Sequence, residues 1–106
     1  MTLIKQTTLT LLAFLLTAVS LHAADRDGEL RAAEKAYADG NYPAAAEQYE
    51  ALIKNYGESA EVYYNLGNTY YKLGRIAPAI LNYERALSMS PNDGDTRFNL
   101  EMARLR

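Results

Sequence analysis

The sequence predicts an all-α fold, a solenoid of helix-turn-helix units with about two and a half repeats in five helices. The first supporting observation is that the chain matches itself at an offset of 34 residues, which aligns Tyr49 with Tyr83. The second is that apolar residues recur at helical spacing, and no segment shows the alternation of a strand. The third is composition: 49% of the 106 residues are hydrophobic and 23% are charged, which is enough apolar material for a packed core.

The N-terminal residues, 1–23, have the features of a secretory signal peptide. Lys5 is the only charge before Asp25, and the stretch from Leu9 to Val19 is an apolar run. The small residues Ala23 and Ala24 follow, as expected of a cleavage site. We therefore expect export to the periplasm or cell envelope, with cleavage after Ala23. The alternative is an uncleaved segment that anchors the protein to a membrane.

The first repeat is predicted over residues 26–59, with helices at about 26–39 and 42–56. It is degenerate. Ala32 and Ala33 stand where the second repeat has a Leu-Gly pair, and Gly57 replaces the closing proline. Gly40 follows the first helix and predicts a left-handed residue at its end.

The second repeat, residues 60–93, has helices predicted at about 60–73 and 76–89. Gly74 and Pro91 are expected to end them. The small side chains are expected to let the two helices approach closely while tyrosines fill the space beside them. The predicted packing residues are Tyr63, Leu66, Gly67, Tyr70, Ala79, Tyr83, Ala86 and Pro91.

A last helix is predicted at about 95–106, within a segment 94–106 that is either a capping helix or the start of a third repeat. Asn92, Asp93 and Asp95 offer side-chain oxygens for its N-terminus. Phe98, Met102 and Leu105 share one face, and we expect this face to cover the open flank of the fourth helix.

These residues and spacings resemble the tetratricopeptide repeat (TPR), whose aromatic, Leu-Gly, Tyr, Ala, aromatic and Pro positions are filled in the second copy. Residues 63–75 (Tyr-Tyr-Asn-Leu-Gly-Asn-Thr-Tyr-Tyr-Lys-Leu-Gly-Arg) and the ending Arg-Phe-Asn-Leu-Glu-Met-Ala-Arg further resemble the N-terminal part of BatE-like proteins of the bacterial aerotolerance operon group. That resemblance implies a non-catalytic envelope scaffold beside von Willebrand A-type and MoxR-type partners. BatE-like proteins continue into membrane helices, so the chain could also be the N-terminal fragment of a larger membrane-anchored protein.

The composition disfavours several other functions. The chain has no cysteine, and its single histidine is His22, inside the predicted signal peptide. Thiolate metal sites, thiol nucleophiles and histidine-based triads therefore lack their usual residues. The net charge is -2, and the sequence has no basic stripe that would bind nucleic acid. We expect no enzyme activity, no cofactor, no metal, and neither a nucleic acid nor a small-molecule substrate as ligand.

A protein or peptide partner is expected in the concave groove, because first helices of a helix-pair solenoid line that side. The predicted groove residues lie off the packing stripe: Tyr37, Tyr64, Asn65, Asn68, Tyr71 and Phe98. The wider set on the same helices includes Leu30, Arg31, Glu34, Glu61, Lys72, Asn99 and Met102. Tyrosine gives contact area, and asparagine can pair with a peptide backbone. The alternatives are that Tyr64 and Tyr71 pack on the neighbouring repeat, and that Asn65 and Asn68 are exposed without partners.

A structural, self-associating module is the competing function. Tyr42, Tyr49 and Tyr56 recur at heptad spacing and could face another subunit, although Tyr49 is expected in the core and the other two at its rim.

Overall fold

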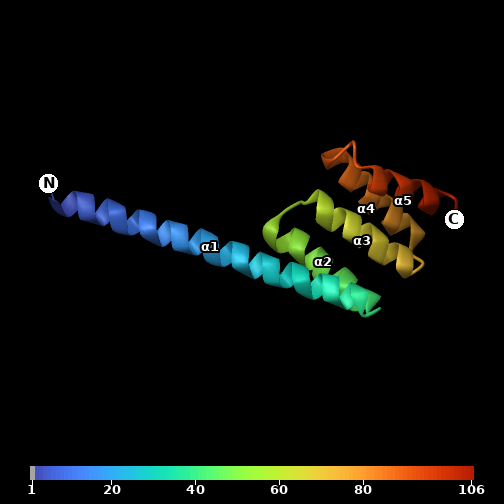
Figure 1. Ribbon diagram of the computed structural model, residues 1–106, viewed down its shortest axis with the longest axis horizontal. Helices are drawn as coiled ribbons and strands as arrows, with labels where there is room; N and C mark the ends of the chain where they lie inside the picture. Colours follow the sequence, from blue (N-terminus) through green and yellow to red (C-terminus); the bar gives the residue numbers. More distant parts are fainter. Residues whose placement is uncertain (1) are drawn as a thin grey trace.

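The structure, a computed structural model, describes residues 2–106, with the side chains of Thr10, Leu11, Phe14 and residues 21–106. Over this range it consists of helices and short connections, without a strand. The helices are α1 (Thr2–Ala38), α2 (Tyr42–Tyr56), α3 (Ala60–Lys72), α4 (Ile76–Met89) and α5 (Gly94–Arg104). Each helix packs on the next, and α5 also touches α3, which is the arrangement of a solenoid (Figure 1). The predicted fold class is confirmed.

Helix α1 differs most from the sequence expectation, because it begins at Thr2 rather than near residue 26. Its C-terminal part packs on α2, and its N-terminal part extends away from the other helices (Figure 1), giving the molecule a length of 69 Å. The helix runs through the boundary between Ala23 and Ala24, where we expect cleavage. The signal peptide stays a prediction, since most side chains of residues 1–20 lie outside the described residues.

Among the described residues, no helix combines the length and the apolar composition needed to cross a membrane.

The connection within each repeat has the same geometry, as the glycine pattern predicts. Gly40 and Gly74 have φ angles of 78° and 73°, in the left-handed region that glycine enters without a Cβ penalty. The next amide then bonds back to the helix: Asn41 N donates to Ala36 O at 2.8 Å, and the amide one repeat later makes the equivalent bond at 2.9 Å. Both helix ends thus satisfy their carbonyls in the same way.

Side-chain caps begin three of the helices. Asn41 Oδ1 accepts from Ala44 N at the start of α2, and Ser59 Oγ accepts from Val62 N at the start of α3. Asp93 caps α5, because its Oδ1 accepts from the Asp95 and Thr96 amides. Of the three residues proposed to start the last helix, Asp93 is the one that does so.

The predicted packing residues of the second repeat form the interface between α3 and α4. Six are buried: Tyr63, Leu66, Gly67, Ala79, Tyr83 and Ala86. Tyr70 is half-buried, and its hydroxyl donates to Glu50 Oε1 at 2.8 Å. Pro91 is exposed in the turn, so its role is to follow the helix rather than to pack. Gly67 lies so close to α4 that an added Cβ would be 2.6 Å from Tyr83 Cδ1.

The face of α5 that packs is not the one expected. Phe98, Met102 and Leu105 are 65%, 42% and 79% exposed, whereas Leu100 and Ala103 are 3% and 0% exposed. The prediction of the covering face is therefore wrong. The physical reason is register: Leu100 lies 34 residues after the buried Leu66, so α5 docks on the preceding repeat with the same stripe as α3.

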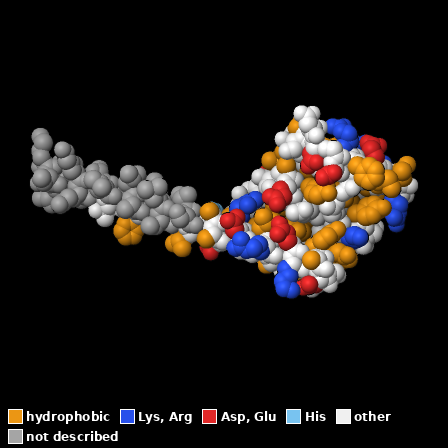
Figure 2. All heavy atoms as spheres, viewed as in Figure 1, with side chains coloured by type: hydrophobic (Ala, Val, Ile, Leu, Met, Phe, Trp, Pro, Cys, Tyr) orange, Lys and Arg blue, Asp and Glu red, His pale blue; other side chains and the backbone are white. Residues whose placement is uncertain are grey.

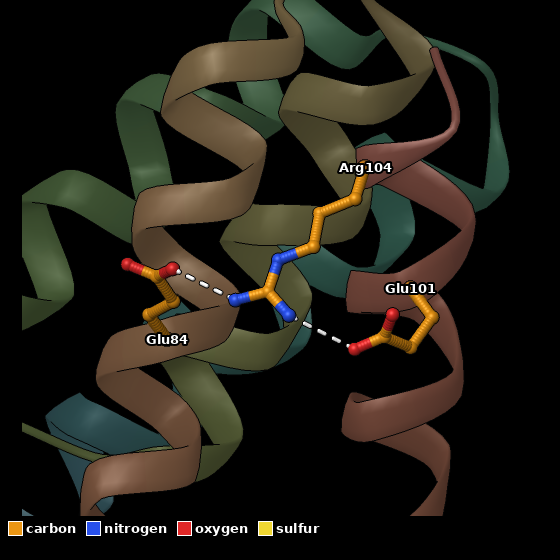
Figure 3. A network of polar contacts seen from close by, with 3 residues as sticks. All are labelled: Glu84, Glu101 and Arg104. Atoms are coloured by element: carbon orange, nitrogen blue, oxygen red, sulfur yellow. Dashed lines mark hydrogen bonds and ion pairs between the residues drawn. The ribbon is translucent and has the colours of Figure 1, made fainter.

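An ion-pair network joins the outer edges of α4 and α5. Arg104 donates to Glu84 Oε1 of α4 at 3.2 Å and to Glu101 Oε1 of its own helix at 2.9 Å (Figure 3). All three side chains are about half exposed, so each pair contributes about 1 kcal/mol or less.

Candidate functional site

A pocket of about 290 Å³ opens on the side of the molecule formed by the first helices of the three units. It is lined by Tyr37 of α1, by Asn68, Tyr71 and Lys72 of α3, by Tyr83 of α4, and by Asn99 and Met102 of α5. Its volume is near the lower end of the range for ligand pockets, which suits one large side chain of a partner. Three of the predicted groove residues, Tyr37, Asn68 and Tyr71, therefore surround one pocket.

A hydrogen-bonded network holds the floor of this pocket. Asn68 Oδ1 accepts from the Tyr83 hydroxyl and from Asn99 Nδ2, the latter at 2.9 Å. Asn99 Nδ2 also donates to the Tyr64 hydroxyl at 3.2 Å. Asn68 is thus not an amide exposed without a partner. Because its Oδ1 accepts both bonds, the Asn68 amide group is oriented by residues of α4 and α5. Its Nδ2 can still donate hydrogen bonds to a ligand.

The other three predicted groove residues do not line the pocket. Tyr64 is half-buried, with its ring 6.3 Å from that of Tyr83 in its own repeat, and its hydroxyl accepts from Asn99 of the next unit. Asn65 is half-buried, and its backbone oxygen accepts from Thr69 Oγ1 at 2.7 Å. Phe98 lies on the exposed surface of α5.

Tyr83 is the pocket residue whose contribution sequence reasoning missed. It is one of the packing aromatics, and its ring lies against Gly67 in the core. Its hydroxyl nevertheless reaches Asn68 on the pocket floor. The repeat pattern asks only for an aromatic at this position, so no local signal predicts the second role. Lys72, Asn99 and Met102 belong to the wider set that the helical register had placed on the concave side.

Two of the pocket tyrosines, Tyr37 and Tyr83, are neutral hydrogen-bonding groups at physiological pH. Burial, together with neighbouring phenols, raises the pKa of Tyr83 and of Tyr37 above the ordinary value of 10. Burial also raises the pKa of Tyr49, the equivalent of Tyr83 in the first repeat, to about 12, and nearby Glu34, Tyr37 and Glu61 add to the shift. Tyr37 and Tyr83 therefore offer hydroxyls and aromatic faces without negative charge.

Two cations stand at the rim formed by α3 and α5. Lys72 lines the pocket and is exposed. Arg106 donates to the Tyr71 hydroxyl at 3.1 Å, with its guanidinium carbon 5.4 Å from the centre of the Tyr71 ring. Tyr71 is thereby fixed by a hydrogen bond and a cation–π contact at the mouth of the pocket.

A second pocket, of about 410 Å³, lies between α2 and α3. Its lining is Pro43, Ala46, Glu47, Glu50, Tyr70, Leu73 and Arg75. Glu47 and Glu50 are exposed there, and Glu50 accepts from Tyr70. Within the described part of the chain, no group of three or more His, Cys, Asp or Glu side chains is placed to hold a metal ion.

The heptad-spaced tyrosines of α2 do not form one exposed row. Tyr49 is 2% exposed in the core, as expected. Tyr42 is half-buried with its ring edge-on to that of Tyr37, at 5.3 Å between centroids. Tyr56 packs against His22 at 4.7 Å and donates to Glu29 Oε1 at 3.2 Å. All three thus contribute to packing within the chain, two of them against α1.

Comparison with protein families agrees with this geometry. Residues 60–93 match a tetratricopeptide repeat model, and residues 12–59 match a second tetratricopeptide repeat model. A search of curated proteins found no match. Together the two repeat matches span most of the chain, and the helices they cover pack as the repeat requires. The chain therefore belongs to the tetratricopeptide repeat family, whose members typically act as non-catalytic scaffolds for protein–protein interaction.

Proposed function

We propose that this protein binds a segment of a partner protein in the pocket between α1, α3 and α5, and that it works there as a scaffold without catalysis. The observation that carries the proposal is the pocket itself, where Tyr37, Tyr71 and Met102 from three different helices meet. Aromatic side chains on rigid helices are the groups that most often anchor an interface.

The floor of the pocket supports the same conclusion. Asn68 and Asn99 are held in place by each other and by the Tyr83 hydroxyl, so they lose little freedom when a ligand binds. Their remaining hydrogen-bonding capacity suits the backbone or a polar side chain of a peptide.

The test is a selection of random short peptides displayed on phage, with the full chain immobilised. Enriched peptides are synthesised, and their affinities are measured for the wild type and for Tyr71→Ala. Loss of an anchoring aromatic is expected to cost about 2 kcal/mol, or roughly thirtyfold in affinity.

Tyr56→Ala is the matched control, because Tyr56 is also half-buried but packs against His22 of α1 and does not line the pocket. Both variants are first shown to keep the circular dichroism spectrum of the wild type. If every enriched peptide binds Tyr71→Ala as tightly as the wild type, the groove is not the binding site.

We also propose that the protein is exported and cleaved after Ala23. In the full chain, α1 has no acidic residue in its first turn. A helix that begins at Ala24 would carry Asp25 and Asp27 in its first turn, where negative charge stabilises a helix N-terminus by about 0.3–1 kcal/mol each. Intact mass of the protein produced in a Gram-negative host is expected to correspond to a chain beginning at Ala24. Retained Met1 on a cytoplasmic product would reject export.

The envelope setting follows the resemblance to BatE-like proteins, and the proposed partner class is a von Willebrand A-type envelope protein. The test is direct binding of a purified von Willebrand A-type domain encoded near this gene. Binding that is lost in Tyr71→Ala and retained in Tyr56→Ala is expected. Absence of binding to every such domain would remove this partner class and leave the peptide-binding proposal intact.

A further inference from the structure

We propose that the pocket selects an acidic segment, in which an apolar anchor residue is followed by a carboxylate that meets Lys72 and Arg106. This inference rests on the proposed function and adds the chemistry of the partner. Its first support is that Lys72 is the only charged residue in the lining of the pocket. The remaining lining residues carry aromatic, amide or thioether side chains, which can accept an apolar side chain. Within the lining, only Lys72 can therefore select a ligand by its charge.

The two rim cations are available for a ligand. Among the described residues, the ion pairs of Lys and Arg involve Arg26, Lys35 and Arg104. Lys72 and Arg106 make none of these pairs. Arg106 is nevertheless oriented, because its Nη1 donates to the Tyr71 hydroxyl at the mouth of the pocket. A carboxylate at this rim would gain charge-assisted hydrogen bonds without breaking an existing pair.

The opposite end of the groove carries the opposite charge. Glu34 of α1 and Glu61 in the first turn of α3 lie close enough to the Tyr49 hydroxyl to affect its ionisation. Glu34 occupies the register position that Asn68 holds one repeat later. The groove therefore carries carboxylates near Tyr49 and cations at the rim of α3 and α5. A bound segment is expected to direct its acidic residue away from Glu34 and Glu61.

The exposed face of α5 supplies the apolar part of the surface. Phe98, Met102 and Leu105 share one helical face, and Met102 also lines the pocket. On the face of the molecule in Figure 2, hydrophobic side chains gather over the end formed by α4 and α5, with Lys and Arg side chains beside them. An apolar anchor next to a carboxylate matches this combination of an apolar surface and two cations.

The experiment uses the enriched peptides described above, synthesised in three versions that keep the apolar residues and carry Glu, Gln or Lys at the charged position. Affinities are measured with the full chain at low and high salt. The Glu version is expected to bind about three- to tenfold more tightly than the Gln version, and the Lys version more weakly still. The preference should shrink as salt rises, because the cations are exposed.

The double variant Lys72→Gln/Arg106→Gln is expected to remove the preference for Glu while it still binds the Gln version. The charge-matched control is Lys35→Gln/Lys54→Gln, which changes net charge equally at residues that do not line the pocket. Equal affinity for the three peptides, or an unchanged Glu preference in Lys72→Gln/Arg106→Gln, would overturn the inference while Tyr71→Ala still tests the groove. Peptides that bind Tyr71→Ala as tightly as the wild type would overturn both this inference and the proposed function.

Discussion

The two end helices of the described solenoid, α1 and α5, bury opposite faces. Both are first helices of a unit, and they share a register with α3 at offsets of 34 residues. In α3 one stripe faces the preceding repeat, and Val62 and Leu66 on it are buried. The same stripe is exposed on α1, and Ala32 takes the position of Leu66. On α5 the stripe is buried again, with Leu100 in that position.

The stripe that faces the following helix shows the reverse pattern. Gly67 of α3 is buried against Tyr83, and Ala33 of α1 is buried in the core cluster of the first repeat. The equivalent residue of α5 is Glu101, exposed and paired with Arg104. In the described structure, each of these two helices is thus apolar on the stripe that contacts another helix and polar or small on the stripe that is exposed. Burial in a solenoid follows contact between neighbouring units rather than helix sequence alone.

The largest effect is expected where α5 meets the preceding repeat. Leu100→Ala removes a buried side chain and is predicted to lower the free energy of unfolding by about 2–4 kcal/mol. Leu105→Ala changes a side chain that is 79% exposed and is predicted to stay within about 0.5 kcal/mol of the wild type. Urea unfolding followed by circular dichroism measures both. A larger loss for Leu105→Ala would reverse our assignment of the packed face.

The next effect compares two glycines in helices. Gly67→Ala would place a Cβ 2.6 Å from the Tyr83 ring, and we expect a loss of about 1–3 kcal/mol. Gly28→Ala is the matched control, because a Cβ at Gly28 in α1 has nothing within 4 Å. Alanine there is expected to stabilise the helix by about 0.5–1 kcal/mol. Urea midpoints that move in the same direction for both variants would contradict the close approach of α3 and α4.

The third effect is confined to alkaline pH and concerns Tyr49, the first-repeat equivalent of Tyr83. Burial, aided by Glu34, Tyr37 and Glu61, raises its native-state pKa from 10 to about 12. Between these values the native state holds a proton that the unfolded state has lost. The stabilisation that results from the raised pKa of Tyr49 is therefore fully present below pH 10. It falls by about 1.4 kcal/mol per pH unit as pH rises from 10 toward 12.

Tyr49→Phe removes this phenol and is expected to lose less stability than the wild type between about pH 9 and about pH 12. Urea unfolding at both pH values measures the difference, and the neutral-pH midpoints of the two proteins correct for altered packing. Parallel losses in wild type and Tyr49→Phe would show that this phenol does not titrate later in the native state.

The sequence by itself determined α2 to α5 and the connections between them, because the signals are local. Glycine after a helix, an Asn, Ser or Asp cap, and apolar spacing each act within a few residues. The starts and ends of α2 to α5 follow from such signals to within about one or two residues. The positions of Tyr37, Asn68 and Tyr71 off the packing stripe also predicted them as groove residues, and these three line one pocket.

Only the tertiary structure decided which residues of α5 are buried and which groove residues meet in a pocket. Phe98, Met102 and Leu105 form the more hydrophobic stripe of α5, but Leu100 and Ala103 face the preceding repeat and are buried instead. Tyr83 joins the pocket because its ring spans the core while its hydroxyl reaches Asn68. Helical periodicity fixes how side chains are distributed around one helix, whereas burial depends on where its neighbours lie.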